Sequence, residues 1–265
     1  MVMLVLKGKD ASMQAFRVVL LFAGLVAAPA GSAAQKTIRI SDSLARNAER
    51  LKVERGAQWM GHIGKWRFGD YAVVSGKPGW THTRTTGNFF QTESESRTHE
   101  TFTFVLTNAA TDSAVVNAAR NANVQELHKL DLGHGWSLGR DELVQESENF
   151  TALITINRDT TETWVLFLGS TSGSDTPSKH VAFLTNGERK ILLSLASSNK
   201  NAYDFRGSPA FGYEFVGNGQ PLCALQYYGG SYDFTQVVWM HRSLDARMKL
   251  ILAAAMTAVL QVRTP

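Results

Sequence analysis

Tight turn sequences join short apolar segments in the second half of the chain, and this arrangement constrains the fold more than any other feature. KHVAFLT and RKILLSLA flank Asn186-Gly187, a strong two-residue hairpin signal because both turn residues tolerate positive φ. FGYEFV and PLCALQYY flank Gly217-Asn218-Gly219 in the same way. Successive hairpins build an antiparallel sheet, whereas parallel strands need long crossover connections.

The segments themselves alternate with the period of a strand. In HETFTFVLT, Phe102, Phe104 and Leu106 share one face and threonines occupy the other. The same alternation recurs in NFTALITIN, which precedes ETWVLFLG across residues 157–160, and QVVWMH follows near the C-terminus. We therefore predict a mainly β (α+β) fold, an antiparallel sheet of consecutive hairpins that is barrel-like or a sandwich.

Two helices are expected in the first half of the chain. Ser41-Asp42-Ser43 followed by LARNAERLKVERG has an N-cap cluster, helically spaced leucines and Gly56 as a stop, which predicts a short amphipathic helix. The segment Ser113 to Leu130 also fits a helix, although its three asparagines lower the helix propensity.

A third helix is expected at the C-terminus, starting near Ser243 and Asp245. Its stretch Leu250 to Leu260 carries no charge. Eleven residues span about 16 Å of helix, roughly half the hydrocarbon thickness of a bilayer. We expect no transmembrane span in the mature chain. The helix should instead be buried against the sheet, with its second face meeting either this chain's own strands or a partner.

Residues 1–34 have the layout of a secretory signal peptide: a basic start, the apolar run Val18 to Ala28, and small residues up to Ala34. Translation from Met1 or from Met13 fits this layout. Residues 35–265 are then a single mostly β domain, exported to the periplasm or secreted. The mature chain keeps 24 basic and 22 acidic residues, a net charge of +2. This balance gives no electrostatic footprint for nucleic acid.

No established cofactor or metal motif is present. Cys223 is the only cysteine, so an intrachain disulfide is excluded, and its setting in PLCAL favours a small buried thiol. His128, Asp131 and His134 lack the spacing that zinc hydrolases use. Gly217-Asn218-Gly219 has no third glycine and no following helix for a dinucleotide. We expect neither a metal site nor a cofactor.

Catalytic residues are only weakly indicated, and the sequence leans against an enzyme. Glu214, Asp233 and His241 would be the candidates for a hydrolase-like site, provided that strand ends bring them within hydrogen-bond reach of one another.

Aromatic residues on the predicted strands suggest either a ligand pocket or a filled core. The candidate ligand-binding residues are Trp66, Trp164, Tyr213, Tyr227, Trp239 and Arg242. Gly64-Lys65-Trp66 after a short helix, antiparallel hairpins, and Arg242 before a C-terminal helix together resemble the lipocalin-like barrels, which implies a small apolar ligand. About ten strand candidates stand where that family has eight, so no family is assigned.

Three functions remain open at this point. The first is an exported, non-catalytic binding or envelope-associated module that takes a small apolar ligand or a protein partner. The second is an enzyme with an unrecognised acid and histidine site. The third is a subunit that docks through its C-terminal helix; the sequence does not indicate an oligomeric state.

Overall fold

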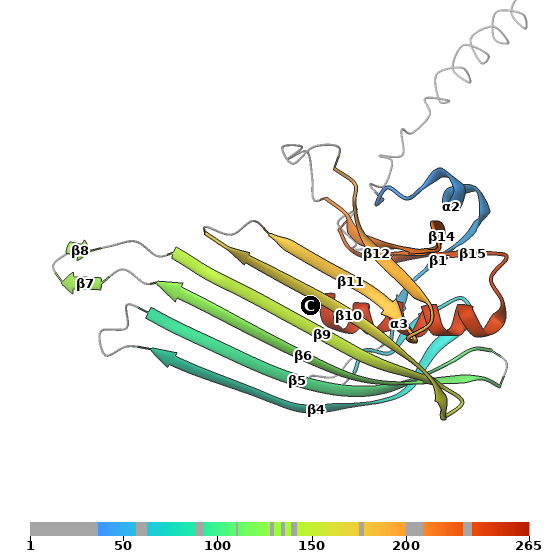
Figure 1. Cartoon of the computed structure of the whole chain (residues 1–265), viewed down its shortest axis with the longest axis horizontal. Helices are drawn as coiled ribbons and strands as arrows, with labels where there is room; N and C mark the ends of the chain where they lie inside the picture. The colour runs from blue at the N-terminus through green and yellow to red at the C-terminus, as the bar shows by residue number, and fades with distance from the viewer. Residues whose placement is uncertain are drawn as a thin grey trace, which may run out of the picture. The chain divides into compact units, whose positions relative to one another are not determined.

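The computed structural model describes residues 37–56, 63–87, 93–109, 111–127, 130–133, 136–138, 142–174, 178–199, 209–229 and 235–264 (Figure 1). Residues Lys36–Pro265 form one compact unit, which is described here by itself. The expected signal peptide, residues 1–34, lies outside the described residues.

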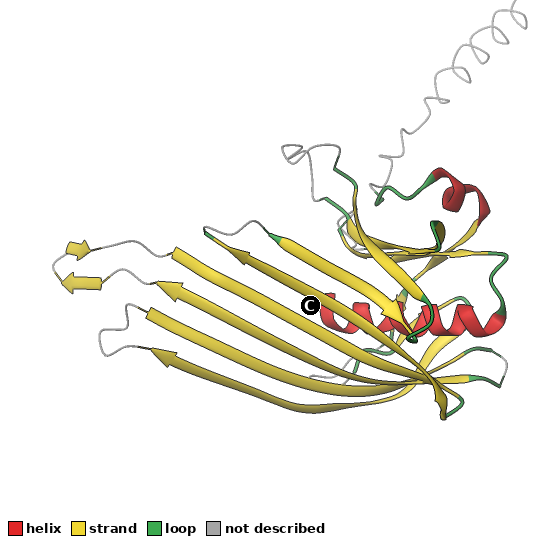
Figure 2. Ribbon diagram, viewed as in Figure 1, coloured by secondary structure: helices red, strands yellow, loops and turns green. Residues whose placement is uncertain are grey.

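Antiparallel strands dominate this unit, which confirms the predicted mainly β class (Figure 2). Thirteen of the described strands form one sheet, and β7 and β8 form a separate hairpin. The sheet order is β1-β15-β14-β13-β12-β11-β10-β9-β6-β5-β4-β3-β2. The described elements are α2 (Asp42–Asn47), β1 (Ala48–Lys52), β2 (Glu54–Arg55), β3 (Trp66–Phe68), β4 (Tyr71–Gly87), β5 (Glu93–Thr107), β6 (Ser113–Leu127), β7 (Leu130–Gly133), β8 (Trp136–Leu138), β9 (Glu142–Ile156), β10 (Asp159–Gly173), β11 (Lys179–Thr185), β12 (Lys190–Ser197), β13 (Phe211–Gly217), β14 (Gln220–Tyr228), β15 (Val237–His241) and α3 (Ala246–Arg263).

The sheet is barrel-like because its two ends meet along the chain. β1 is the first strand in the sheet order and β2 is the last, yet only Val53 separates them in sequence. The backbone N–H of Val53 donates to the carbonyl of Gln236, the residue before β15. The sheet therefore returns to its starting edge, and of the two predicted forms the structure has the barrel-like one.

The helix α3 fills the inside of this curved sheet. Every residue from Leu250 to Leu260 is buried, and the helix contacts β6, β9 and β14. Three consecutive alanines at 253–255 allow close approach to the strands, and the buried Thr257 hydroxyl donates to the Ala253 carbonyl over 2.8 Å. The predicted buried helix is confirmed, and its faces meet this chain's own strands.

A second, smaller core lies on the opposite face of the sheet, beneath the segment that carries α2. Ile38 and Leu44 pack there with Ala224, Val237 and Trp239. The sheet is thus covered on both faces around β14 and β15, which explains why those strands read as continuous apolar runs.

Two helix predictions need correction. The segment predicted as a helix from Ser113 to Leu130 is the strand β6, because its small apolar residues alternate and Ala114, Val116 and Ala118 are buried at every second position. The N-terminal helix starts as expected, with Ser41 as its cap, but it ends at Asn47 instead of continuing to Gly56. Pairing with β15 draws the following residues into β1.

The predicted hairpins are confirmed, but the turn between β11 and β12 is centred one residue later than predicted. Asn186 N–H donates to the Arg189 carbonyl, so Gly187, with φ +94°, and Glu188 are the central residues. Asn218 and Gly219, between β13 and β14, also have positive φ, as do Asn157 and Arg158 between β9 and β10. Within the described part of the chain, no helix is long and apolar enough to cross a membrane.

Candidate functional site

Several long strands extend beyond the end of α3, so that the helix no longer covers this part of the sheet. Figure 1 shows β4, β5, β6 and β9 extending beyond the C-terminal end of α3. We call the face against which α3 packs the inner face, and the opposite one the outer face. Because side chains alternate along a strand, Phe102 and Phe104 place the even residues of β5 on the inner face and the odd residues on the outer face.

A buried ion-pair cluster marks the border between the core and this extension. Glu148 accepts from Arg120 Nε and from Arg263 Nη1, each over 2.6 Å. Burial alone would raise the pKa of Glu148, but the charges of Arg263 and Arg120 together outweigh burial and lower it. The pair Tyr213 and Tyr227 lies in the same field, and burial raises the pKa of Tyr227 to about 12. Each charge here has a partner, so the cluster fits a structural role.

The outer face of the extension carries a group of polar and cationic side chains that we call the outer array. They come from paired positions on β4, β5, β6 and β9 and line an open pocket of about 470 Å³. Among the described residues that line this pocket, none is acidic. The side chains of the outer array belong to His82, Arg84, Arg97, His99, Asn121, Asn123, Ser147 and Asn149.

The register of β4 against β5 places like groups opposite each other. His82 pairs with His99, and Arg84 pairs with Arg97. Side chains at directly opposite positions lie about 5 Å apart at Cβ, and like charges there destabilise a sheet. Within the described ranges, no carboxylate lies at salt-bridge distance from Arg84, which leaves its charge uncompensated.

The remaining members of the array are held by hydrogen bonds. Arg97 donates through Nε to Glu95 Oε1 over 2.9 Å, and Asn123 donates to the same oxygen over 3.1 Å. These bonds, that from Arg97 first, lower the pKa of Glu95. His99 Nδ1 lies 2.7 Å from Asn121 Oδ1. Because an amide oxygen only accepts, Nδ1 of His99 donates this hydrogen bond.

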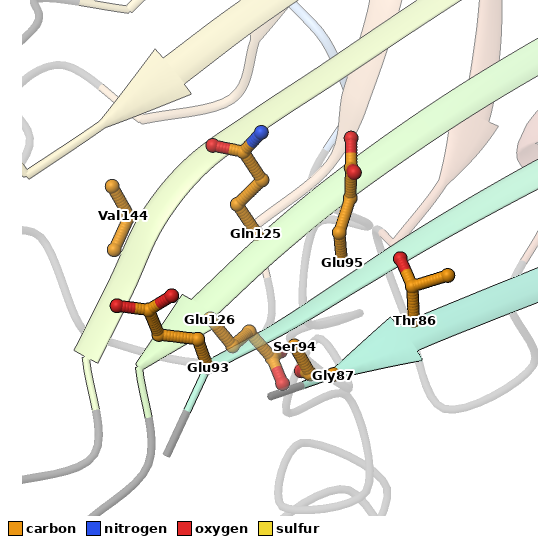
Figure 3. Close-up of a pocket in the computed structure, with 8 residues that line it drawn as sticks. All are labelled: Thr86, Gly87, Glu93, Ser94, Glu95, Gln125, Glu126 and Val144. Atoms are coloured by element: carbon orange, nitrogen blue, oxygen red, sulfur yellow. The ribbon is translucent and has the colours of Figure 1, made fainter. Parts of the chain in front are cut away.

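A second pocket, of about 510 Å³, adjoins the array toward the strand ends. Figure 3 shows Glu95 and Gln125 rising from neighbouring strands on the same side of the sheet. Glu93 lines this pocket from the outer face of β5, and Glu126, which pairs with Ser94, reaches it from the inner face. The outer face is therefore acidic at Glu93 and Glu95, where the outer array is basic. The outer face of the extension is therefore electrostatically divided, with Glu95 at the boundary.

The two described catalytic candidates, Glu214 and His241, do not contact each other and have separate hydrogen-bond partners. Glu214 accepts from Ser41 N over 3.1 Å and from Ser41 Oγ over 2.6 Å, which ties α2 to the sheet. His241 Nδ1 lies 2.9 Å from Ser243 Oγ. Glu214 is on β13 and His241 on β15, two strands away and two residues beyond the position opposite Glu214, so their backbones are about 12 Å apart. Asp233 lies outside the described residues, and the enzyme interpretation stays a prediction.

The aromatic ligand-binding candidates are divided between the two cores. Trp66, Trp164 and Tyr213 are buried in the core around α3, with Tyr227 packed against it, and Trp239 belongs to the smaller core. Arg242 is exposed, and its carbonyl accepts from Lys249. None of these residues lines either of the two pockets described above. A small apolar ligand therefore stays a prediction.

Of the residues considered for a reactive thiol or a metal site, Cys223 is described, whereas two of the metal candidates are not. Cys223 is a free, fully buried thiol, and burial raises its pKa well above the ordinary value. Within the described ranges, no group of three metal-ligating side chains comes together. His128 and His134 lie outside those ranges.

Sequence reasoning did not select the members of the outer array. Their signal is the strand alternation of THTRTTG in β4 and ESESRTHE in β5, where a charged or imidazole side chain recurs at every second residue. Only the register between the two strands brings these residues together. Comparison with known proteins gave no match to any family model, curated protein or solved structure.

Proposed function

We propose that this protein is an exported, non-catalytic binding module that holds an anionic ligand on its outer array. The observation that carries the proposal is the pairing of Arg84 with Arg97 and of His82 with His99 on a solvent-facing surface. Glu95 neutralises Arg97, whereas Arg84 has no carboxylate partner among the described residues, so a bound oxyanion would supply the counter-charge that Arg84 lacks.

The chemistry of the array supports an oxyanion. Guanidinium groups bind carboxylate or phosphate oxygens in a bidentate manner, and charge-assisted hydrogen bonds are about twice as strong as neutral ones. Asn149 and Ser147 add neutral donors and acceptors on the neighbouring strand.

Replacing Arg84 by alanine should lower ligand affinity without lowering stability. We expect polyacrylate, a carboxylate polymer, to bind the purified protein, and R84A to weaken this binding about tenfold, as the loss of about 1.4 kcal/mol implies. The midpoint of urea unfolding should stay unchanged, because Arg84 is exposed and its loss breaks no salt bridge among the described residues. Isothermal titration calorimetry and urea unfolding measure the two effects.

The matched control is R189A, which removes the same charge from the exposed turn between β11 and β12. It should leave polyacrylate affinity within a factor of about two, since exposed charges act weakly at a distance in salt. Neutral dextran should not bind, and polyphosphate in place of polyacrylate separates phosphate from carboxylate preference. If R189A and R84A weaken binding equally, or if neither polyanion binds, the outer array is not a binding site.

A further inference from the structure

The array borders an edge of β4 with which no described strand pairs beyond Ala72. On one side β4 pairs with β5 over nearly its whole length, but on the other side β3 pairs only with Tyr71 and Ala72. Beyond Ala72, none of the described residues pairs with that edge. A free edge presents unpaired backbone N–H and C=O groups, which can accept another strand.

The first part of this edge is protected against pairing with another strand, whereas the second part has regular strand geometry. Between Val73 and Thr81, two register shifts, Lys77 and Pro78 interrupt the strand, and these are the features with which proteins block edge pairing. From Thr81 to Gly87 the register with β5 is unbroken and proline is absent. Four of these seven residues are threonines, which favour strand structure. The regular edge is about 23 Å long.

Resting on the proposed function, we infer that the edge of residues 81–87 pairs with an extended acidic segment of a protein partner as an added strand. In that position, alternate side chains of the partner lie on the outer face, opposite His82 and Arg84. β4 contains no acidic residue. Charge complementarity therefore favours an acidic partner over a second copy of this chain, whose β4 would oppose cations with cations.

Two methylated peptides test this inference. The probe is an acetylated, amidated seven-residue peptide that alternates threonine and glutamate, titrated into the ¹⁵N-labelled protein and followed through the backbone amide signals of residues 81–87. One variant peptide is N-methylated at every glutamate and the other at every threonine. In an added strand, alternate N–H groups point to the protein and the others point away. One methylated peptide should therefore bind at least tenfold more weakly than the parent, and the other within about threefold of it.

The outcomes separate this inference from the proposed function. If the parent peptide binds and both methylated forms lose affinity equally, or if only polyacrylate binds, the array holds anions without strand addition and the inference is wrong. If neither the peptide nor polyacrylate binds, the proposed function fails. If sedimentation equilibrium shows a dimer that the peptide does not dissociate, a second copy occupies the edge, and the inference is again wrong. R84A should weaken the parent peptide about tenfold, whereas R189A should leave its affinity within about twofold.

Discussion

Replacing Leu252 by aspartate is expected to abolish the cooperative folding of this protein. Leu252 is fully buried in the middle of α3, inside the curved sheet. Truncating a buried leucine costs about 2–5 kcal/mol, and burying an unpaired carboxylate costs several kcal/mol more. The sum approaches the whole stability of a typical domain, about 5–15 kcal/mol. Urea unfolding followed by near-ultraviolet circular dichroism should show no native baseline for L252D.

The matched control places the same charge on the same helix. Ala246 is exposed in the first turn of α3, where an acidic side chain is favourable to the helix dipole. A246D should therefore change the free energy of unfolding by less than about 0.5 kcal/mol. A folded, monomeric L252D protein would contradict the buried placement of α3 and would instead support a helix whose apolar face serves an oligomer.

Replacing Glu148 by alanine is expected to destabilise the protein by about 3 kcal/mol. The substitution leaves Arg120 and Arg263 without the carboxylate that both contact, and the side chain of Glu148 is only 9 % exposed. Arg120 is 35 % exposed, so solvent compensates part of its loss and the lower end of the usual 3–5 kcal/mol applies. Chemical denaturation at neutral pH measures the effect.

Two variants make this result specific. E148Q keeps the shape and an acceptor oxygen, so it should cost less than E148A. E95A breaks the pair between Glu95 and Arg97 on the outer face, and it should destabilise the protein much less than E148A because solvent screens this pair. If E148A and E95A destabilise the protein equally, the ion-pair cluster of Glu148, Arg120 and Arg263 does not stabilise the core more than an ion pair on the outer face does.

The same cluster predicts a dependence of stability on pH. Because the pKa of Glu148 is lower in the folded protein than the ordinary value of 4.5, its stabilising contribution is present above that value. The contribution is lost as pH falls from 4.5 through the folded pKa. Unfolding measured at a series of pH values below 5 should therefore show a steeper loss for the wild-type protein than for E148Q.

Local patterns were enough to predict most strands but not all element boundaries. The hairpin between β11 and β12 follows from Gly187, which adopts positive φ, and the alternation of Phe102, Phe104 and Leu106 follows from one buried face. The helix prediction for β6 is wrong because alanine is the strongest helix former, so the alanines of this segment favour a helix locally. Pairing with β5 on one side and β9 on the other decides its structure.

The candidate site was less accessible to sequence reasoning. Arg84 and Arg97 are thirteen positions apart, and nothing in either segment says that they face each other. Their opposition depends on the register shift between Pro78 and Thr81, because slipping a strand by one residue moves its side chains to the other face. The sequence favoured aromatic residues such as Trp164 as ligand-binding candidates, but Trp164 is buried in the hydrophobic core.

The sequence by itself determined the antiparallel class, the hairpins and the C-terminal helix with its uncharged stretch Leu250 to Leu260, because each depends on residues close together in the chain. The tertiary structure decided that the sheet curves back to Val53, that α3 lies inside it, and that four cationic or imidazole side chains share one outer surface. These features depend on strand register and on burial between distant segments, which local propensities do not encode.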